Sequence, residues 1–273
     1  MKLSGGNDRR SEDTTIRAPR LKGVPALTRG IAVLRLLGRR EEPLGVNAIA
    51  RKLDLIPSTC LHILRVLVAE GLVAFDGDSK RYSLDAGVLG LARGYLARPS
   101  FPALVQSGLD DLARRHGVAA IGMRVQGLQH VTVVAVSRSE APIRLHIDVG
   151  RRFPAMISAT GRCVAALSGR GMAELEARFR QLRWENAPTL RDWRRQVHEA
   201  SERGYGVDEG HYIGGVTSVA APVLDAVGRM SHAVGIMAVS DQVRRAGLAR
   251  LAADVREVAE TVAFRLRSRE STA

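Results

Sequence analysis

The most constraining feature of this chain is a run of three short helical patterns between Leu27 and Gly71, in which apolar residues recur every three or four positions. Gly38 closes the first pattern, and Asn47 is the expected N-cap of the second. Pro57 suits the first turn of the third helix, because its missing N–H would have no partner there. The segment therefore predicts three short helices packed around one core.

A hairpin pattern follows these helices. Residues 72–75 and 80–84 are apolar-rich runs that flank an Asp-Gly-Asp-Ser turn. Three helices followed by a hairpin is the order of a winged helix-turn-helix, whose third helix enters the major groove of DNA. We therefore predict a winged helix-turn-helix DNA-binding domain over residues 23–84, preceded by a disordered tail over residues 1–22.

The third helix is expected to present a polar face opposite its apolar stripe. Ser, Thr, His and Arg side chains can donate to phosphates or to base edges, whereas the helix start and the wing exit reach the flanking backbone. The predicted DNA-binding residues are Thr28, Arg29, Ser58, Thr59, His62, Arg65, Lys80 and Arg81. Any one of these residues alone would favour an ordinary helical bundle with a solvated polar face. Their combination with the order of elements favours DNA over an ordinary helical bundle.

The charge distribution agrees with a polyanionic partner. The chain carries a net charge of +13. Residues 1–98 hold 17 Lys and Arg against 10 Asp and Glu, and the longer remainder holds 24 against 18. The first third is thus about twice as positive per residue, which indicates that nucleic acid binds at this end.

The rest of the chain predicts a linker and a second domain. Residues 85–100 form an apolar helix that is expected to pair with the same helix of a second subunit. Strand patterns at 119–125, 130–136, 143–149, 216–224 and 232–240 then mix with helical ones near 159–168, across 172–203 and after 248. We predict an α+β effector-binding domain with an antiparallel sheet over residues 101–269.

Cysteine usage and hydropathy set the compartment. Cys60 and Cys163 lie inside apolar helical patterns and are expected to be buried thiols. The sequence shows neither a signal-peptide pattern nor an apolar run long enough for a bilayer. We therefore expect a cytoplasmic protein with no membrane partner, no metal site and no cofactor.

At this point the chain resembles the IclR, or isocitrate lyase regulator, family of bacterial transcription factors over about residues 24–268. In the first domain the resemblance depends on LTRGIAVL at 27–34, IARKL at 49–53, ST at 58–59, EGLV at 70–73 and RYSL at 81–84. In the second it depends on VGRRFP at 149–154, SATGR at 158–162, RGYGVDE at 203–209, VAAPV at 219–223 and DAVGR at 225–229.

The resemblance implies a GAF-like effector domain and dimers or tetramers that bind palindromic operators. It also implies that a small organic acid or aromatic compound alters transcription, as a repressor's or an activator's effector. With His211 added from its position beside Asp208, the expected effector-binding residues are Ser158, Ala159, Thr160, Gly161, Asp208, His211, Ser218, Gly235 and Met237.

Departures from the family pattern bear on the effector and on DNA. Gly210 and His211 replace an acidic pair, and His62 replaces a frequent arginine on the third helix. Gly235 and Met237 stand where serines are common. We expect this last change to make the cavity wall roomier and less polar, which favours an aromatic or otherwise bulky acid.

The start of the helix near residue 159 is a candidate carboxylate site. Free backbone N–H groups and the hydroxyls of Ser158 and Thr160 can hold an anion there. We expect Arg162 to be solvated. For Asp208, a contact with a ligand hydroxyl and an exposed turn position are equally favoured.

Two other classes of function stay open. An enzyme built on the larger domain would need a nucleophile beside a base, but Ser218 lacks a Gly-x-Ser-x-Gly elbow and the histidines are scattered. A ligand-free architectural DNA-binding protein would have a collapsed or filled pocket. We predict a regulator rather than an enzyme, with no catalytic residues.

Overall fold

The structure, a computed structural model, describes residues 24–96, 100–138, 145 and 147–270. It divides into two compact units, Met1–Leu96 and Ala97–Ala273, which are described separately. In the residues described, no helix is both long and apolar enough to cross a membrane.

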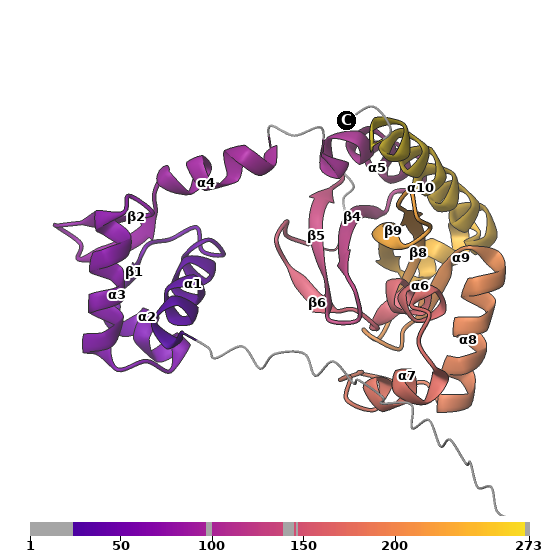
Figure 1. The fold of residues 1–273 in the computed structure, drawn as a ribbon, viewed down its shortest axis with the longest axis horizontal. Helices are drawn as coiled ribbons and strands as arrows, with labels where there is room; N and C mark the ends of the chain where they lie inside the picture. The colour runs from indigo at the N-terminus through magenta and orange to yellow at the C-terminus, as the bar shows by residue number, and fades with distance from the viewer. Residues whose placement is uncertain (1–23, 97–99, 139–144, 146, 271–273) are drawn as a thin grey trace, which may run out of the picture. The chain divides into compact units, whose positions relative to one another are not determined.

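The first unit contains three helices, a small sheet and a fourth helix (Figure 1). Its helices are α1 (Pro25–Leu37), α2 (Val46–Leu53), α3 (Pro57–Ala69) and α4 (Gly87–Leu96), and its strands are β1 (Leu44–Gly45), β2 (Val73–Asp76) and β3 (Arg81–Leu84). The strands pair antiparallel in the order β1-β3-β2. One apolar core under the three helices includes Val33, Ile49, Leu64 and Tyr82.

Two local features of this unit differ from the sequence prediction. Asn47 is not the N-cap of α2, because the helix begins after Gly45, whose backbone is extended. The strand β1 was not predicted, since only two residues pair with β3 and no period can show in so short a segment.

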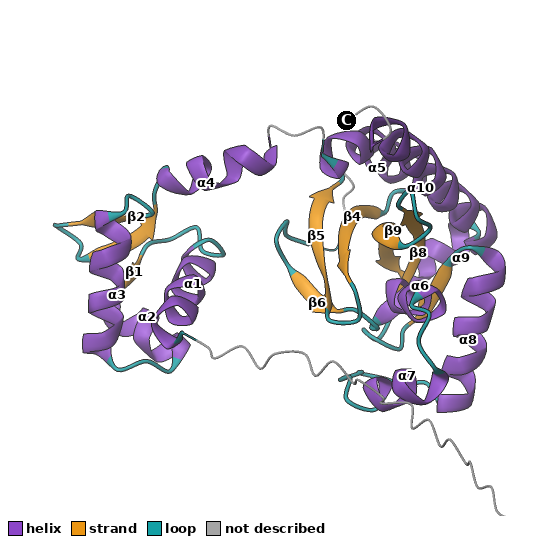
Figure 2. Ribbon diagram, in the orientation of Figure 1, coloured by secondary structure: helices purple, strands orange, loops and turns teal. Residues whose placement is uncertain are grey.

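The second unit is built on a six-stranded antiparallel sheet in the order β6-β5-β4-β9-β8-β7 (Figure 2). Its strands are β4 (Ala119–Gln126), β5 (His130–Val136), β6 (Arg152–Pro154), β7 (Gly206–Glu209), β8 (Val216–Leu224) and β9 (Met230–Val239). Its helices are α5 (Phe101–His116), α6 (Ser158–Leu167), α7 (Met172–Phe179), α8 (Leu190–Arg203), α9 (Ser240–Ala246) and α10 (Leu248–Glu270).

Each face of this sheet carries its own apolar core. One core joins α5 and α10 to alternate residues of β8 and β9, such as Val219 and Ile236. The other joins α6, α7 and α8 to the opposite residues of β4, such as Ile121 and Met123. Both faces are covered, so the strands are apolar almost throughout.

The predicted strand over 143–149 is wrong in its described part. Residues 143, 144 and 146 lie outside the described residues, while 145 and 147–149 form no strand and Val149 is 63% exposed. The next strand, β6, pairs with β5 instead. In the described residues 145 and 147–149, alternating apolar residues thus produced the period of a strand where no strand forms.

The predicted helical stretch over 172–203 is two helices, α7 and α8, with a break between them. Pro188 disfavours a helical conformation in the residue before it. Thr189 then caps α8, because its hydroxyl accepts a hydrogen bond from the backbone N–H of Asp192 at 3.1 Å.

Candidate functional sites

The outer face of α3 carries the first site. Ser58, His62 and Arg65 are exposed and Thr59 is half-buried, whereas Cys60, Leu64 and Leu67 are buried on the opposite side. The spacing of three and four residues between the polar positions places them along one face. Three donors of different geometry are therefore presented together, as readout of base edges requires.

The hairpin of β2 and β3 forms a wing beside this helix. In its turn, Asp76 accepts hydrogen bonds from the Ser79 hydroxyl and the Asp78 N–H, and these bonds lower the pKa of its carboxyl. Lys80 and Arg81 follow, both exposed. The Lys80 ammonium lies 5.9 Å from the centre of the Phe75 ring, and the Arg81 guanidinium donates to the Pro43 carbonyl at 3.4 Å. Two cations are thus held at the turn of the wing, where β3 begins.

Exposed polar residues also lie on α1 and α2 of this unit. Thr28 and Arg29 are exposed on α1, where the Thr28 hydroxyl donates to the Val24 carbonyl of its own helix. Arg51 and Lys52, which the sequence analysis did not assign, are exposed in the last turn of α2. Their signal was available, because the first helix of a helix-turn-helix crosses the DNA backbone.

The second site is a small cavity between α6 and the sheet of the second unit. Its volume is about 30 Å³, close to that of one water molecule in the liquid. Five predicted effector-binding residues line it: Ser158, Ala159, Thr160, Ser218 and Met237. The sequence analysis missed the apolar side chains around them: Ile121, Met123, Val131, Phe153 and Ile157, together with Tyr212. Their signal was periodicity alone, which marks a core and not a cavity.

Two hydroxyls meet at the polar end of this cavity. The Ser158 and Ser218 Oγ atoms lie 2.7 Å apart, within hydrogen-bond distance. Ser158 has φ of +58°, a backbone conformation that costs a non-glycine residue about 1–3 kcal/mol. Nearby, the Thr160 hydroxyl donates to the Met123 sulfur at 3.6 Å. A strained residue is therefore held with its hydroxyl in the site.

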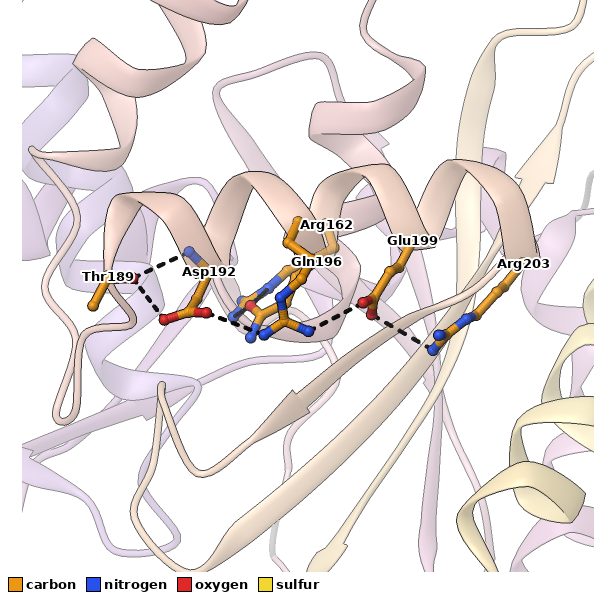
Figure 3. Close-up of polar contacts among 7 residues, drawn as sticks. Arg162, Thr189, Asp192, Gln196, Glu199 and Arg203 are labelled. Atoms are coloured by element: carbon orange, nitrogen blue, oxygen red, sulfur yellow. Dashed lines mark hydrogen bonds and ion pairs between the residues drawn. The ribbon is translucent and has the colours of Figure 1, made fainter.

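Arg162, expected to be solvated, is fully buried. Its guanidinium lies 2.9 Å from Asp208 Oδ1 and donates to the Ser158 carbonyl at 2.8 Å. Its Nε also donates to Gln196 Oε1 at 3.1 Å (Figure 3). Burial lowers the pKa of Arg162, and Asp208 opposes that shift. The expectation was wrong because the local sequence around an arginine in the first turns of a helix is the same whether the side chain is solvated or is paired with a buried carboxylate.

Asp208 is directed at this arginine and not at the cavity. Its Oδ2 accepts from the Tyr212 N–H at 3.1 Å, and His211 Nδ1 lies 3.3 Å from its Oδ1. Asp208 pairs with Ser218 across β7 and β8. The carboxylate thus connects two cavity-lining segments, and neither Asp208 nor His211 lines the cavity.

Close backbone contacts explain two glycines in this region. A Cβ on Gly161 would lie 2.1 Å from the Met156 carbonyl carbon, so this predicted ligand contact is a packing position outside the cavity lining. A Cβ on Gly206 would lie 2.3 Å from the Ala159 carbonyl oxygen. Only glycine at 206 lets β7 approach α6 closely enough for Asp208 to meet Arg162.

The sequence analysis expected Gly235 to make the cavity roomier, but in the structure it does not. A Cβ placed there would lie 3.0 Å from the Met123 methyl and 3.2 Å from the Val219 carbonyl oxygen. The space that the missing side chain leaves is therefore already filled by Met123. Sequence could not show this, because the two residues meet only when β4 pairs with β9.

Metal-ligating side chains are not clustered in the described part of the chain. It contains no cluster of three or more His, Cys, Asp or Glu side chains that could hold a metal ion. Both cysteines are buried, as predicted. The Cys163 thiol donates to the Ala220 carbonyl, and burial raises its pKa to about 12.

A winged helix-turn-helix joined to a sheet domain with an internal cavity defines a DNA-binding regulator with an effector domain. Two family profiles match the chain: "IclR helix-turn-helix domain" over residues 26–77 and "Bacterial transcriptional regulator IclR C-terminal" over residues 95–264. The chain belongs to the IclR family of bacterial transcriptional regulators.

Relatives and solved structures agree with this assignment. A glycerol operon regulatory protein of Streptomyces griseus is 33% identical, over 82% of this chain and 87% of the relative. An IclR transcriptional regulator from Alicyclobacillus acidocaldarius is 25% identical with a TM-score of 0.71, over 88% of this chain and 99% of that one. An IclR homologue from Microbacterium hydrocarbonoxydans, complexed with 4-hydroxybenzoate, shares the fold at 18% identity and a TM-score of 0.73, over 89% and 99%.

Proposed function

We propose that this regulator binds a palindromic operator as a homodimer or homotetramer in the bacterial cytoplasm, and that a small organic acid changes its affinity for that operator. The observation that carries the proposal is the exposed face of α3, formed by Ser58, His62 and Arg65 opposite a buried stripe. These residues read base edges. Lys80, Arg81 and the α1 pair Thr28 and Arg29 contact phosphates.

A dimer is supported by α4, which leaves large apolar side chains uncovered. Leu89 is 65% exposed and Leu91 is 71% exposed in the single chain. Pairing of two such helices would remove this surface from water. It would also present two α3 helices to two half-sites, as a palindromic operator requires.

An acid is supported by the polar end of the cavity. The hydroxyls of Ser158 and Ser218 can both rotate to donate to one carboxylate, in place of the bond they now share. The Microbacterium relative, crystallised with 4-hydroxybenzoate, supports an aromatic acid as one candidate. Function as a regulator and not as an enzyme is supported by the regulatory roles of the relatives and by a cavity lined mainly with apolar side chains.

The test has two stages. The preferred operator is first selected from random DNA and from the DNA upstream of the gene, at several salt concentrations. Carboxylates that raise the melting temperature of the full chain are then added to the protein–operator complex. We expect a tight, sequence-dependent complex whose affinity changes with at least one acid. Weak binding that ignores sequence and disappears as salt rises would refute the proposal.

A further inference from the structure

We propose that Met123 sets the size of the acid that this effector cavity accepts, because its side chain fills the space beside Gly235 and must leave it before a ring can enter. The proposal rests on the proposed function of the cavity as the effector site. It adds the residue that selects between two-carbon and aromatic acids.

Strand register brings these two residues together. Met123 of β4 pairs with Ala233 of β9, so Gly235 is its diagonal neighbour two residues further along β9. Long side chains reach such diagonal neighbours on one face of a sheet. The absence of a side chain at Gly235 leaves room there, and the Met123 methyl occupies it at 3.0 Å from an ideal Cβ position.

The volume of the cavity shows that something has to move. It measures about 30 Å³. A benzene ring occupies an apolar cavity on the order of 150 Å³. The space described is therefore adequate for a water-sized group and inadequate for an aromatic ring.

Met123 is the side chain best suited to move. It lines the cavity and is 3% exposed, and its polar contact is the weak bond from the Thr160 hydroxyl to its sulfur at 3.6 Å. Methionine is unbranched and has three rotatable side-chain bonds, so it changes shape at low cost. The bonds among Arg162, Asp208 and Ser158, in contrast, fix the other wall of the site.

The first experiment compares Met123→Ala with Met156→Ala in the full chain. Met156 is also buried, in the same core, but does not line the cavity. Binding of 4-hydroxybenzoate and of acetate is measured by calorimetry. If the arrangement in which Met123 has left the cavity is populated at about a tenth or less, Met123→Ala strengthens 4-hydroxybenzoate binding at least about tenfold. Met123→Ala changes the affinity for acetate by no more than a few-fold. Met156→Ala changes the affinity for neither acid.

The second experiment uses Gly235→Ala, alone and combined with Met123→Ala. The added methyl displaces the methionine into the cavity, so Gly235→Ala alone weakens 4-hydroxybenzoate binding. In the Met123→Ala background the methyl meets no methionine, and its effect becomes much smaller. The difference between the two effects is the coupling that the proposal requires.

A third measurement follows the Met123 side chain of the wild-type protein directly. The chain has six methionines, so ¹³C labelling of their methyl groups gives a simple spectrum. The Met123 methyl, assigned with the Met123→Ala protein, should shift on addition of 4-hydroxybenzoate, while the Met156 methyl should shift much less.

The possible failures are distinguishable. If wild type binds 4-hydroxybenzoate but Met123→Ala and Met156→Ala have the same preference, or the Met123 methyl does not shift, the size-selecting role of Met123 is wrong and the effector site stands. If no variant and no wild-type protein binds any carboxylate, the proposed effector function fails, and this inference fails with it.

Discussion

The proposed DNA-binding face of α3 and the cavity beneath α6 use polar side chains in opposite ways. On α3, Ser58, His62 and Arg65 point to solvent. Around the cavity, Ser158 is bonded to Ser218 and Arg162 is paired with Asp208 inside the protein. The donors on α3 are therefore exposed before any partner binds, whereas the donors around the cavity already bond to other groups of the protein.

This difference has an energetic consequence. DNA can meet α3 without breaking a bond within the protein, so the cost of binding is mainly that of ordering exposed side chains. A molecule that enters the cavity must separate the two serines or displace Met123. Part of its binding energy is therefore spent on rearranging the site. Such a molecule binds the rearranged conformation better than the present one, and this difference in affinity is what shifts the protein between two conformations.

Removing Arg162 should have the largest effect on stability. Arg162→Ala leaves the Asp208 carboxylate buried without its cation, and we expect a loss of about 3–5 kcal/mol in the free energy of unfolding. Urea unfolding monitored by circular dichroism measures it. Arg195→Ala, which removes an exposed cation paired with Asp192 and Glu199 on α8, is the matched control and should cost far less stability. Equal losses in the two variants would contradict this account.

A half-buried histidine gives the second effect. Burial, together with the nearby Arg124, lowers the pKa of His232 from 6.5 to about 4, and its ring stacks on Phe101 at 4.2 Å. The unfolded chain therefore binds a proton between pH 6.5 and 4 that the folded chain excludes. The free energy of unfolding should therefore decrease as the pH is lowered from 6.5 to 4, by on the order of 3 kcal/mol at pH 4.

His232→Gln tests this expectation. The variant loses the ring stack at every pH, so the informative quantity is the slope of unfolding free energy against pH and not its level. The slope between pH 6.5 and 4 should be clearly shallower in the variant. An unchanged slope would assign the acid sensitivity to other groups.

On the exposed face, single substitutions should act on sequence preference. Arg65→Ala and His62→Ala should each cost about 1–3 kcal/mol of discrimination between the selected operator and a scrambled one. Fluorescence anisotropy with both duplexes measures the ratio. Circular dichroism melting serves as the control, since exposed side chains contribute little to stability. Parallel weakening on both duplexes would show that these residues contact phosphate only.

The smallest effect is expected at the wing. Lys80→Ala removes one phosphate contact, so binding should weaken about equally on all sequences, and the slope of log affinity against log salt should fall by about one. Asp78→Ala, in the same turn but without a cation, should not lower this slope. A change in operator preference with an unchanged slope would place Lys80 in base readout.

The sequence predicted the elements and the exposed side chains of α3 far better than the contacts around the cavity, for a physical reason. The helices of residues 25–69 and the polar positions on α3 follow from periodicity and local signals such as Pro57, which short-range geometry determines. The family resemblance named Ser158 and Ser218, and both line the cavity. The burial of Arg162 and the packing at Gly235 were not predicted, because they depend on partners that only the fold brings near, such as Gln196 and Met123.

The environment of Cys163 limits the kinds of signal this regulator can receive. With its pKa raised to about 12, the thiol is ionised in roughly one molecule in 10⁵ at pH 7. Peroxides and disulfides react with the thiolate, and this sulfur is 1% exposed and bonded to a carbonyl. The sheet domain therefore holds its cysteine beyond the reach of oxidants, and redox stress is not recorded at this position.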